Sequence, residues 1–227
     1  MNEFEMQSSE LNAQTDIHDF HPLTRFFANF FSYLLHPLFI PVYFTAYLTL
    51  VHPNAFVGFS HSEKIKTVLI VLLNVSLFPL MTVLLLKAVG FVDSLYLRNQ
   101  KDRIIPYISS GIFFFWAYTV FKEQHQYPLI LPSFIFGVFL ASSTALIANI
   151  YFKISMHAIG MGGWMGVFLI LFQQQEVLMS WPLALVIVLS GMVCTSRLVL
   201  RSHKPFDIYA GLLVGLLTQF TAYYFVG

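Results

Sequence analysis

The chain alternates long apolar runs with short polar segments, and each run is close to the length of a membrane-spanning helix. After Arg25 the apolar runs approach the ~20 residues that a helix needs to cross the hydrocarbon of a bilayer. Hydrophobic residues make up 57% of the sequence and charged residues 10%, with a mean hydropathy of +0.72. In soluble domains about a quarter of the residues are charged. We therefore predict an all-α integral membrane protein, a polytopic helical bundle of six to seven spans.

Seven candidate spans can be placed along the sequence. Pro37, Pro41, Pro79 and Pro132 lie inside them. These prolines predict kinks, because neighbouring helices in a membrane can satisfy the carbonyl groups that a proline leaves unpaired. The spans are expected at roughly Phe26–Val51, Ile65–Val89, Pro106–Phe121, Leu129–Phe152, His157–Phe172, Trp181–Leu200 and Pro205–Phe225.

The first residues of the chain differ in composition from the rest. Residues 1–22 are polar and carry acidic side chains but no lysine or arginine. They therefore lack the positively charged start of a signal peptide. We predict a flexible polar tail over residues 1–25 and one transmembrane domain over residues 26–227.

Two pairs of glycines have the spacing of close helix contacts in membranes. Gly162 and Gly166 form one small-x-x-x-small pair, and Gly211 and Gly215 form another. Small residues at this spacing let two helix backbones approach closely. We expect all four glycines to serve tight helix packing.

Three polar segments interrupt the apolar runs, with two predicted spans between each segment and the next. They are Asp93–Arg103, Lys153–His157 and Arg197–Asp207. Since two spans return the chain to the side from which it started, all three segments are expected at one face of the membrane. Ionisable groups at membrane depth are costly and usually functional. We therefore expect these segments to form a common site.

The third polar segment contains the groups of a phosphate site. His203 and Asp207 are four residues apart, so on a helix the carboxylate lies on the same face as the imidazole and can hold it. Arg197 ends the preceding apolar run and offers a planar fork of donors that suits phosphate oxygens.

At these residues the chain resembles the type 2 phosphatidic acid phosphatase superfamily, membrane-bound lipid phosphatases that work without metal through a phosphohistidine. The third motif of that family is Ser-Arg, five residues, His, three residues, Asp, and residues 196–207 match every specified position. Its second motif is Pro-Ser-Gly-His, of which Ile154–His157 keeps Ser and His. Its first motif is Lys, six residues, Arg-Pro, and Arg98–Pro106 is basic and ends in proline with a different spacing. The resemblance covers roughly residues 93–220.

The resemblance implies a role for each matching residue. His203 would attack phosphorus, His157 would protonate the leaving group, and Asp207 would hold the His203 ring and stabilise its charge. It also implies no metal and no other cofactor. The implied phosphate-binding residues are Arg197, Ser155, Lys101, Arg103 and Ser196.

Other readings of the same residues remain open. A non-catalytic lipid-phosphate binding protein or transporter on the same fold is the main alternative, because Met156 stands where the motif has a glycine that allows close backbone approach to phosphate. His36 is interpreted as a hydrogen-bonded core histidine, with a role in a substrate groove as the alternative. A metal centre is disfavoured, since His52, His61 and His125 are expected in loops on the opposite side. A net charge of +1 argues against nucleic acid as a partner.

The sequence leaves the orientation in the membrane open. Nine cations are expected on the side of the polar segments, against Lys64, Lys66 and Lys122 on the other side, which would place the site in the cytoplasm. Without Arg98, Lys101, Arg103 and Arg197, which have a possible use in phosphate binding, the counts are five and three. The family resemblance instead favours the periplasmic face of a bacterial inner membrane.

A site at the membrane boundary predicts an amphiphilic substrate whose tail stays among membrane lipids. Polyprenyl diphosphate carriers, phosphatidate or phosphatidylglycerol phosphate, and phosphorylated glycolipid anchors all fit. The sequence does not distinguish between these classes and does not indicate an oligomeric state.

Overall fold

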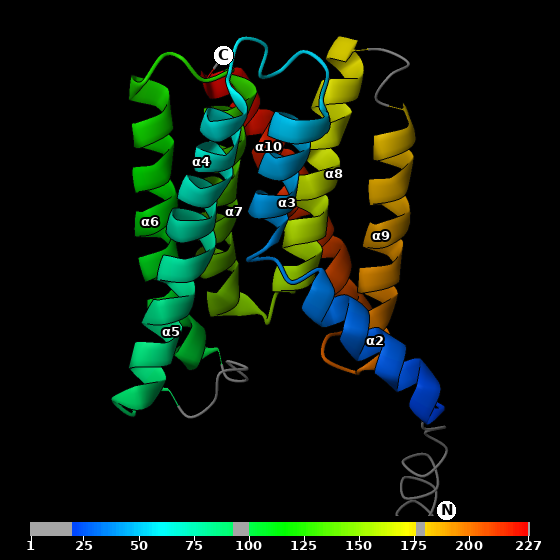
Figure 1. Ribbon diagram of the computed structural model, residues 1–227. Coiled ribbons are helices and arrows are strands. Elements are labelled where there is room, and N and C mark those ends of the chain that lie inside the picture. The colour runs from blue at the N-terminus through cyan, green and yellow to red at the C-terminus, as the bar shows by residue number, and fades with distance from the viewer. Residues whose placement is uncertain (1–19, 93–99, 176–179, 227) are drawn as a thin grey trace, which may run out of the picture.

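The computed structural model describes residues 20–92, 100–175 and 180–226, and within these ranges it contains helices and no strands (Figure 1). Six of the described helical segments are long and apolar enough to cross a membrane. The chain is therefore an integral membrane protein with an all-α bundle, as predicted. The six segments are His61–Ala88, Lys101–Glu123, Ile130–Tyr151, Met156–Gln174, Ser180–Val199 and Pro205–Val226.

The first predicted span, Phe26–Val51, is not one helix, and this corrects the sequence prediction. It is divided into α2 (Pro22–Leu34) and α3 (Ile40–Ala46), and α3 continues as a π-helix over Tyr47–Val51. The break falls around Pro37, where the ring removes a backbone donor and clashes with the preceding turn of a helix. Instead of the expected kink, the helix is interrupted completely between Leu34 and Ile40.

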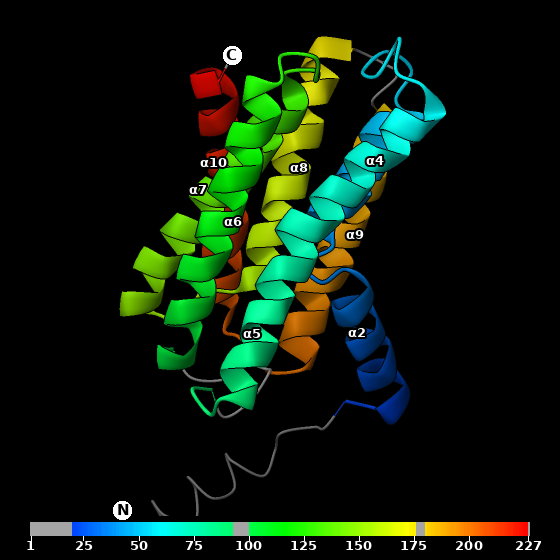
Figure 2. The same cartoon turned by 60° about the vertical axis from the view of Figure 1, so that its left-hand side comes forward.

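Helix α2 also corrects the predicted boundary of the polar tail. It begins at Pro22, with the side chain of His21 accepting a hydrogen bond from the backbone N–H of Leu23, so residues 22–25 are helical. Residues 1–19 lie outside the described part. The helix packs against α9 (Ser180–Val199) and slants away from the bundle in both views (Figures 1 and 2). Its exposed phenylalanines, which include Phe26 and Phe30, suit an interfacial helix with one face in lipid.

The second span starts at a capping box and contains a π-helical stretch. The hydroxyl of Ser60 accepts from the backbone of Glu63, whose carboxylate in turn accepts from the backbone N–H of Ser60. This span consists of α4 (His61–Val71), a π-helix (Leu72–Leu77) and α5 (Phe78–Ala88). The π-helix ends just before Pro79, whose missing N–H interrupts the regular hydrogen bonding.

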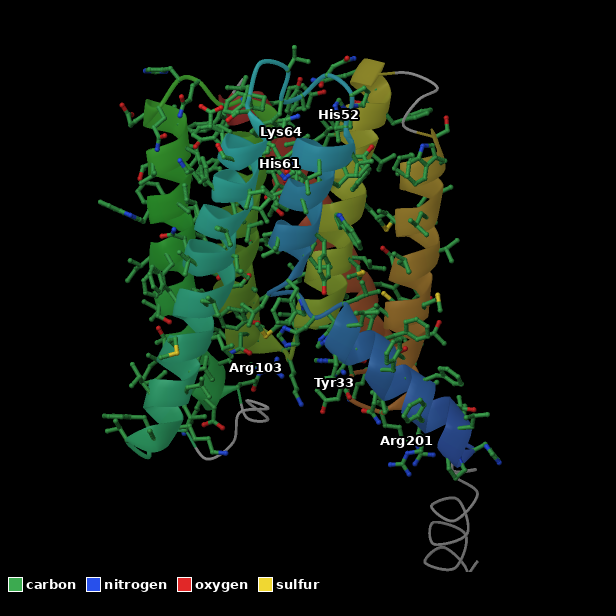
Figure 3. The ribbon with its side chains drawn as sticks, in the orientation of Figure 1. Tyr33, His52, His61, Lys64, Arg103 and Arg201 are labelled. Carbon is green, nitrogen blue, oxygen red and sulfur yellow. The ribbon has the colours of Figure 1, made fainter. Side chains whose placement is uncertain are left out.

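The remaining spans agree with the predicted ranges within a few residues. A short 3₁₀ turn, Lys101–Arg103, leads into α6. The start of α6 and the connections α7–α8 and α9–α10 lie at one end of the bundle (Figure 1). His52, His61 and Lys64 lie at the other end, opposite Arg103 and Arg201 (Figure 3). The predicted sidedness is confirmed for the described residues, whereas residues 93–99 of the first polar segment lie outside them. The helices are α6 (Ile104–Glu123), α7 (Ile130–Tyr151), α8 (Met156–Gln175), α9 and α10 (Pro205–Val226).

The four glycines pack α8 directly against α10, as predicted. A Cβ atom added at Gly162 would overlap the carbonyl oxygen of Leu212, and one added at Gly215 would overlap the carbonyl oxygen of Ile159. The backbones of α8 and α10 are therefore in direct contact at these glycines. Because both helices begin at the end that carries the polar segments, the contact fixes the positions of their first turns relative to each other.

Candidate active site

The three polar segments meet at the loop between α7 and α8. The backbone carbonyl of Lys153 lies 3.1 Å from Nδ1 of His203. The next carbonyl, of Ile154, accepts a hydrogen bond of 3.3 Å from Nη1 of Arg103. The backbone N–H of Ser155 donates to the carbonyl of Asp207 at 3.3 Å. Groups from the starts of α6, α8 and α10 therefore surround one short loop.

His203 is oriented mainly by a backbone carbonyl. A carbonyl only accepts hydrogen bonds, so the short contact with Lys153 requires the proton of the neutral ring to be on Nδ1. Nε2 then carries a lone pair. The nearer carboxylate oxygen of Asp207 is 3.7 Å from the same Nδ1, and it accepts a 3.0 Å hydrogen bond from the backbone N–H of Lys204 at the start of α10. Asp207 thus supports the ring and caps the helix.

His157 is held at the opposite nitrogen. It occupies the second position of α8, and its Nε2 lies 3.0 Å from the backbone carbonyl of Ser32 in α2. The ring of His36, in the turn between α2 and α3, stands nearly perpendicular to it, with ring centroids 5.1 Å apart. The neutral His157 ring therefore keeps its proton on Nε2, and Nδ1 is the nitrogen that can gain or lose a further proton.

Arg197 supplies the positive charge of the site. Its Nη1 donates to the hydroxyl of Ser32 at 3.4 Å, whereas its Nε is buried and has no hydrogen-bond partner among the described residues. Arg103, with 6% of its surface exposed, is also close enough to influence His203 electrostatically. A buried guanidinium donor without an acceptor is costly, and a phosphate oxygen is the acceptor that suits it best.

The other predicted phosphate-binding residues already have local partners or lie at the surface. Ser155 is fully buried, and its hydroxyl accepts from the backbone N–H of Ala158, so it is the N-cap of α8. The hydroxyl of Ser196 donates to the carbonyl of Met192 within α9. Lys101 is exposed. Contact of these three residues with phosphate stays a prediction.

The surroundings keep His203 neutral. Burial first, and then the positive charges of Arg197 and Arg103, lower the pKa of its ring to about 4, although the hydrogen bond with the Lys153 carbonyl partly opposes them. Burial and Arg197 likewise lower the pKa of His36 to about 4. At neutral pH both rings are uncharged, which leaves the lone pair on Nε2 of His203 available for attack on phosphorus.

The lowered pKa values of His203 and His36 predict that the folded protein is less stable in acid. Unfolding returns each ring to its ordinary pKa of 6.5, so between about pH 4 and 6.5 the unfolded chain binds more protons than the folded one. Stability should therefore fall as the pH falls through this range. We expect the thermal midpoint of the purified protein, followed by tryptophan fluorescence, to be lower at pH 5 than at pH 7.

The same measurement on variants identifies the groups responsible. His203→Gln should reduce the dependence of the midpoint on pH, whereas His61→Gln, which changes an exposed histidine at the other end of the bundle, should leave it as in the wild type. A midpoint that rises on acidification, or the same pH dependence in His203→Gln as in the wild type, would contradict the burial of a neutral ring.

The comparisons with known proteins fit this geometry. Residues 148–227 match the family model described as the PAP2 superfamily, a range that contains His157, Arg197, His203 and Asp207. This segment is similar to the PAP2 superfamily. Members of the PAP2 superfamily are phosphatases, and the match supports a phosphoester hydrolase in general. Comparison with curated proteins and with solved structures gave no match.

Two parts of the site lie outside the residues that match the PAP2 superfamily. Arg103 comes from the start of α6, where the sequence predicted a degenerate first motif. Ser32 and His36 come from the N-terminal segment, and no sequence pattern marked Ser32 as part of the site. The two prolines in this apolar run predicted a kink, and His36 was expected to be a core histidine, with a role in a substrate groove as the alternative.

Proposed function

We propose that this chain is a membrane phosphatase of the PAP2 type that hydrolyses a lipid phosphate or diphosphate monoester through a phosphohistidine at His203. The observation that carries the proposal is the arrangement around Arg197. One neutral imidazole has a lone pair on Nε2, a second imidazole can exchange a proton at Nδ1, and a buried guanidinium nitrogen lacks an acceptor.

The first chemical step transfers the phosphoryl group to the protein. The lone pair on Nε2 of His203 forms a nitrogen–phosphorus bond while the bond from phosphorus to the lipid oxygen breaks. The departing oxygen takes a proton from the imidazolium form of His157. Arg197 and Arg103 neutralise charge on the phosphoryl oxygens, which is the main requirement of phosphoryl transfer. The Lys153 carbonyl and Asp207 stabilise the positive charge that develops on His203.

The second step releases phosphate. A water molecule attacks phosphorus while His157, now neutral, takes the proton of the water. The nitrogen–phosphorus bond breaks, its electron pair returns to His203, and inorganic phosphate leaves. His157 ends protonated and His203 neutral, so both are ready for another turnover.

The position of the site favours an amphiphilic substrate. The site lies where α8 and α10 begin, at the end of helices that are long enough to cross the bilayer. A phosphate headgroup can reach this level while its apolar tail stays in lipid. We propose a lipid phosphate as substrate and the periplasmic side of a bacterial inner membrane as the location of the site.

Arg197 offers a test of the electrostatic role. Arg197→Lys keeps the charge but loses Nε and the planar fork, so we expect kcat/KM for phosphate release to fall by ~10²-fold. Arg201→Lys makes the same change at an exposed arginine at the same end of the bundle and should keep the activity of the wild type. Equal activities of the two variants would remove Arg197 from the proposed site.

The function itself is tested by phosphate release from phosphatidate, phosphatidylglycerol phosphate and a polyprenyl diphosphate. The purified protein is assayed in detergent with a chelator present. Release from at least one of them, lost in His157→Ala, supports the proposal. Binding of these lipids without turnover would instead support a non-catalytic lipid-phosphate binding protein or transporter. Release that requires added magnesium would overturn the mechanism.

A further inference from the structure

The turn between α2 and α3 is held against the site from several sides. A Cβ atom added at Gly160 would lie 3.0 Å from Cβ of Pro37, so the glycine lets the turn approach α8 one helical turn beyond His157. The hydroxyl of Ser76 donates to the carbonyl of Leu38, and the hydroxyl of Tyr43 donates to the carbonyl of Leu34 at 2.8 Å. The turn is therefore fixed by packing and hydrogen bonds to α8, the second span and α3.

The last turns of α2, just before this turn, contact two of the proposed functional groups through a single residue. The carbonyl of Ser32 faces Nε2 of His157 at 3.0 Å, while its hydroxyl accepts from Arg197 at 3.4 Å. Ser32 itself is buried, with 5% of its surface exposed. It joins the general acid to the phosphate-binding arginine, although it lies more than a hundred residues before either of them in the sequence.

His36 adds a second constraint on His157. A single hydrogen bond at Nε2 leaves the imidazole free to swing about that contact. The ring of His36 meets it edge to face, with centroids 5.1 Å apart and planes at 84°. His36 is itself oriented, because its Nδ1 accepts a hydrogen bond of 3.4 Å from the backbone N–H of Leu38. The two contacts together define the orientation of the His157 ring.

We propose that the α2–α3 turn is a fourth segment of the active site and that His36 is a positioning residue for His157. The inference rests on the proposed phosphatase function. The sequence favoured a hydrogen-bonded core role for His36, with a substrate groove as the alternative, whereas its ring contact with His157 predicts that its replacement lowers activity. The role is confined to orientation: His36 holds the ring so that Nδ1 of His157 meets the leaving oxygen, and it takes no part in bond breaking.

The test uses three replacements of His36 in the full chain, assayed by phosphate release from phosphatidate or from whichever substrate the wild type hydrolyses. His36→Ala should lower kcat by about tenfold to a hundredfold with KM changed less than about twofold, because misplacing a catalytic group by an ångström costs rates of this order. His36→Phe keeps a ring against His157 and should recover most of kcat. His36→Asn keeps an acceptor for the N–H of Leu38 but has no ring, and should stay as slow as alanine.

A double-mutant cycle separates positioning from general damage to the fold. If His36 acts through His157, adding His36→Ala to His157→Ala should cause less than about a twofold further loss, measured with p-nitrophenyl phosphate, because the two single effects are then not additive. If the losses caused by His36→Ala and His157→Ala instead multiply in the double variant, the proposal is overturned. So would recovery by His36→Asn and not by His36→Phe, or an increase in KM alone, which would indicate contact with substrate.

A second pair of variants covers the case in which His36→Ala does not fold. Gly160→Ala pushes on Pro37 and should lower kcat, whereas Gly191→Ala makes the same change in α9, where a Cβ atom meets nothing within 4 Å, and should leave kcat unchanged. Equal kcat values for the two variants would overturn the proposal. A wild type with no phosphatase activity would overturn the proposed function instead, so the two failures are distinguishable.

Discussion

Replacement of His203 by alanine is expected to lower phosphate release by ~10⁴-fold or more, the largest effect of any single substitution in this chain, because it removes the nucleophile itself. The structure gives this residue a neutral ring, a proton fixed on Nδ1 by the Lys153 carbonyl, and a lone pair on Nε2. Among the described residues, His157 is the other proposed catalytic histidine, but its Nε2 is held by the Ser32 carbonyl and its Nδ1 is assigned the role of the acid. The measurement is the rate of phosphate release in detergent with a chelator present.

The control for His203→Ala is His61→Ala. His61 is exposed and lies at the opposite end of the bundle, so its loss should leave the rate within about twofold of the wild type. Thermal unfolding of both variants shows whether the protein is still folded. Near-normal turnover by folded His203→Ala would refute the assignment of His203 as the nucleophile. The roles of His203 and His157 would then have to be exchanged or given up.

The largest expected effect on stability is at the contact between α8 and α10. Gly215→Ala places a Cβ atom on the carbonyl oxygen of Ile159 and against the backbone of Gly163, and neither is a flexible side chain that can move aside. The helices must separate, so we expect a destabilisation of at least about 2 kcal/mol, at the upper part of the range for overpacking. The thermal midpoint and the monodisperse fraction in detergent should both fall. Activity should fall with them, since the first turns of these two helices carry His157 and Asp207.

Gly191→Ala is the matched control for this substitution. It also replaces a glycine in a membrane-spanning helix, but the new methyl group meets open space. Alanine favours the helix over glycine by about 0.5–1 kcal/mol, so this variant should be as stable as the wild type or slightly more stable. Equal midpoints for Gly215→Ala and Gly191→Ala would show that α8 and α10 are not in backbone contact.

The later spans and the position of the polar segments at one end of the bundle could be predicted from the sequence. Both depend on features of the sequence itself, as does the third motif. Apolar length determines the helices, and an even number of spans between the segments determines the sidedness. The spacing of His203 and Asp207 predicted their proximity, but His203 lies just before α10, so the two residues do not share a helix face as expected. The glycine pairs likewise predicted tight helix packing, because small residues at that spacing let helix backbones approach closely, but they did not identify which helices meet.

The contribution of the first apolar run could not be predicted in the same way. Phe26–Val51 is long enough for one tilted helix, and prolines indicate an irregularity without its size. Whether Pro37 bends the chain or interrupts it depends on Gly160 and Ser76, which lie far away in the sequence. The partners of both histidines are backbone carbonyls, of Ser32 and Lys153, and any residue has such a group. No residue type marks these partners in advance.

The central claim is that phosphate is carried on His203, and trapping that intermediate tests it most directly. The His157→Ala variant is incubated with radiolabelled p-nitrophenyl phosphate, whose leaving group needs no proton, so that His203 can be phosphorylated while attack by water on the intermediate is slow. We predict an acid-labile, base-stable label that maps to the peptide containing His203 and is absent from the double variant with His203→Ala. A label on another residue, or turnover of phosphate by the wild type with no label in any of these proteins, would contradict the account.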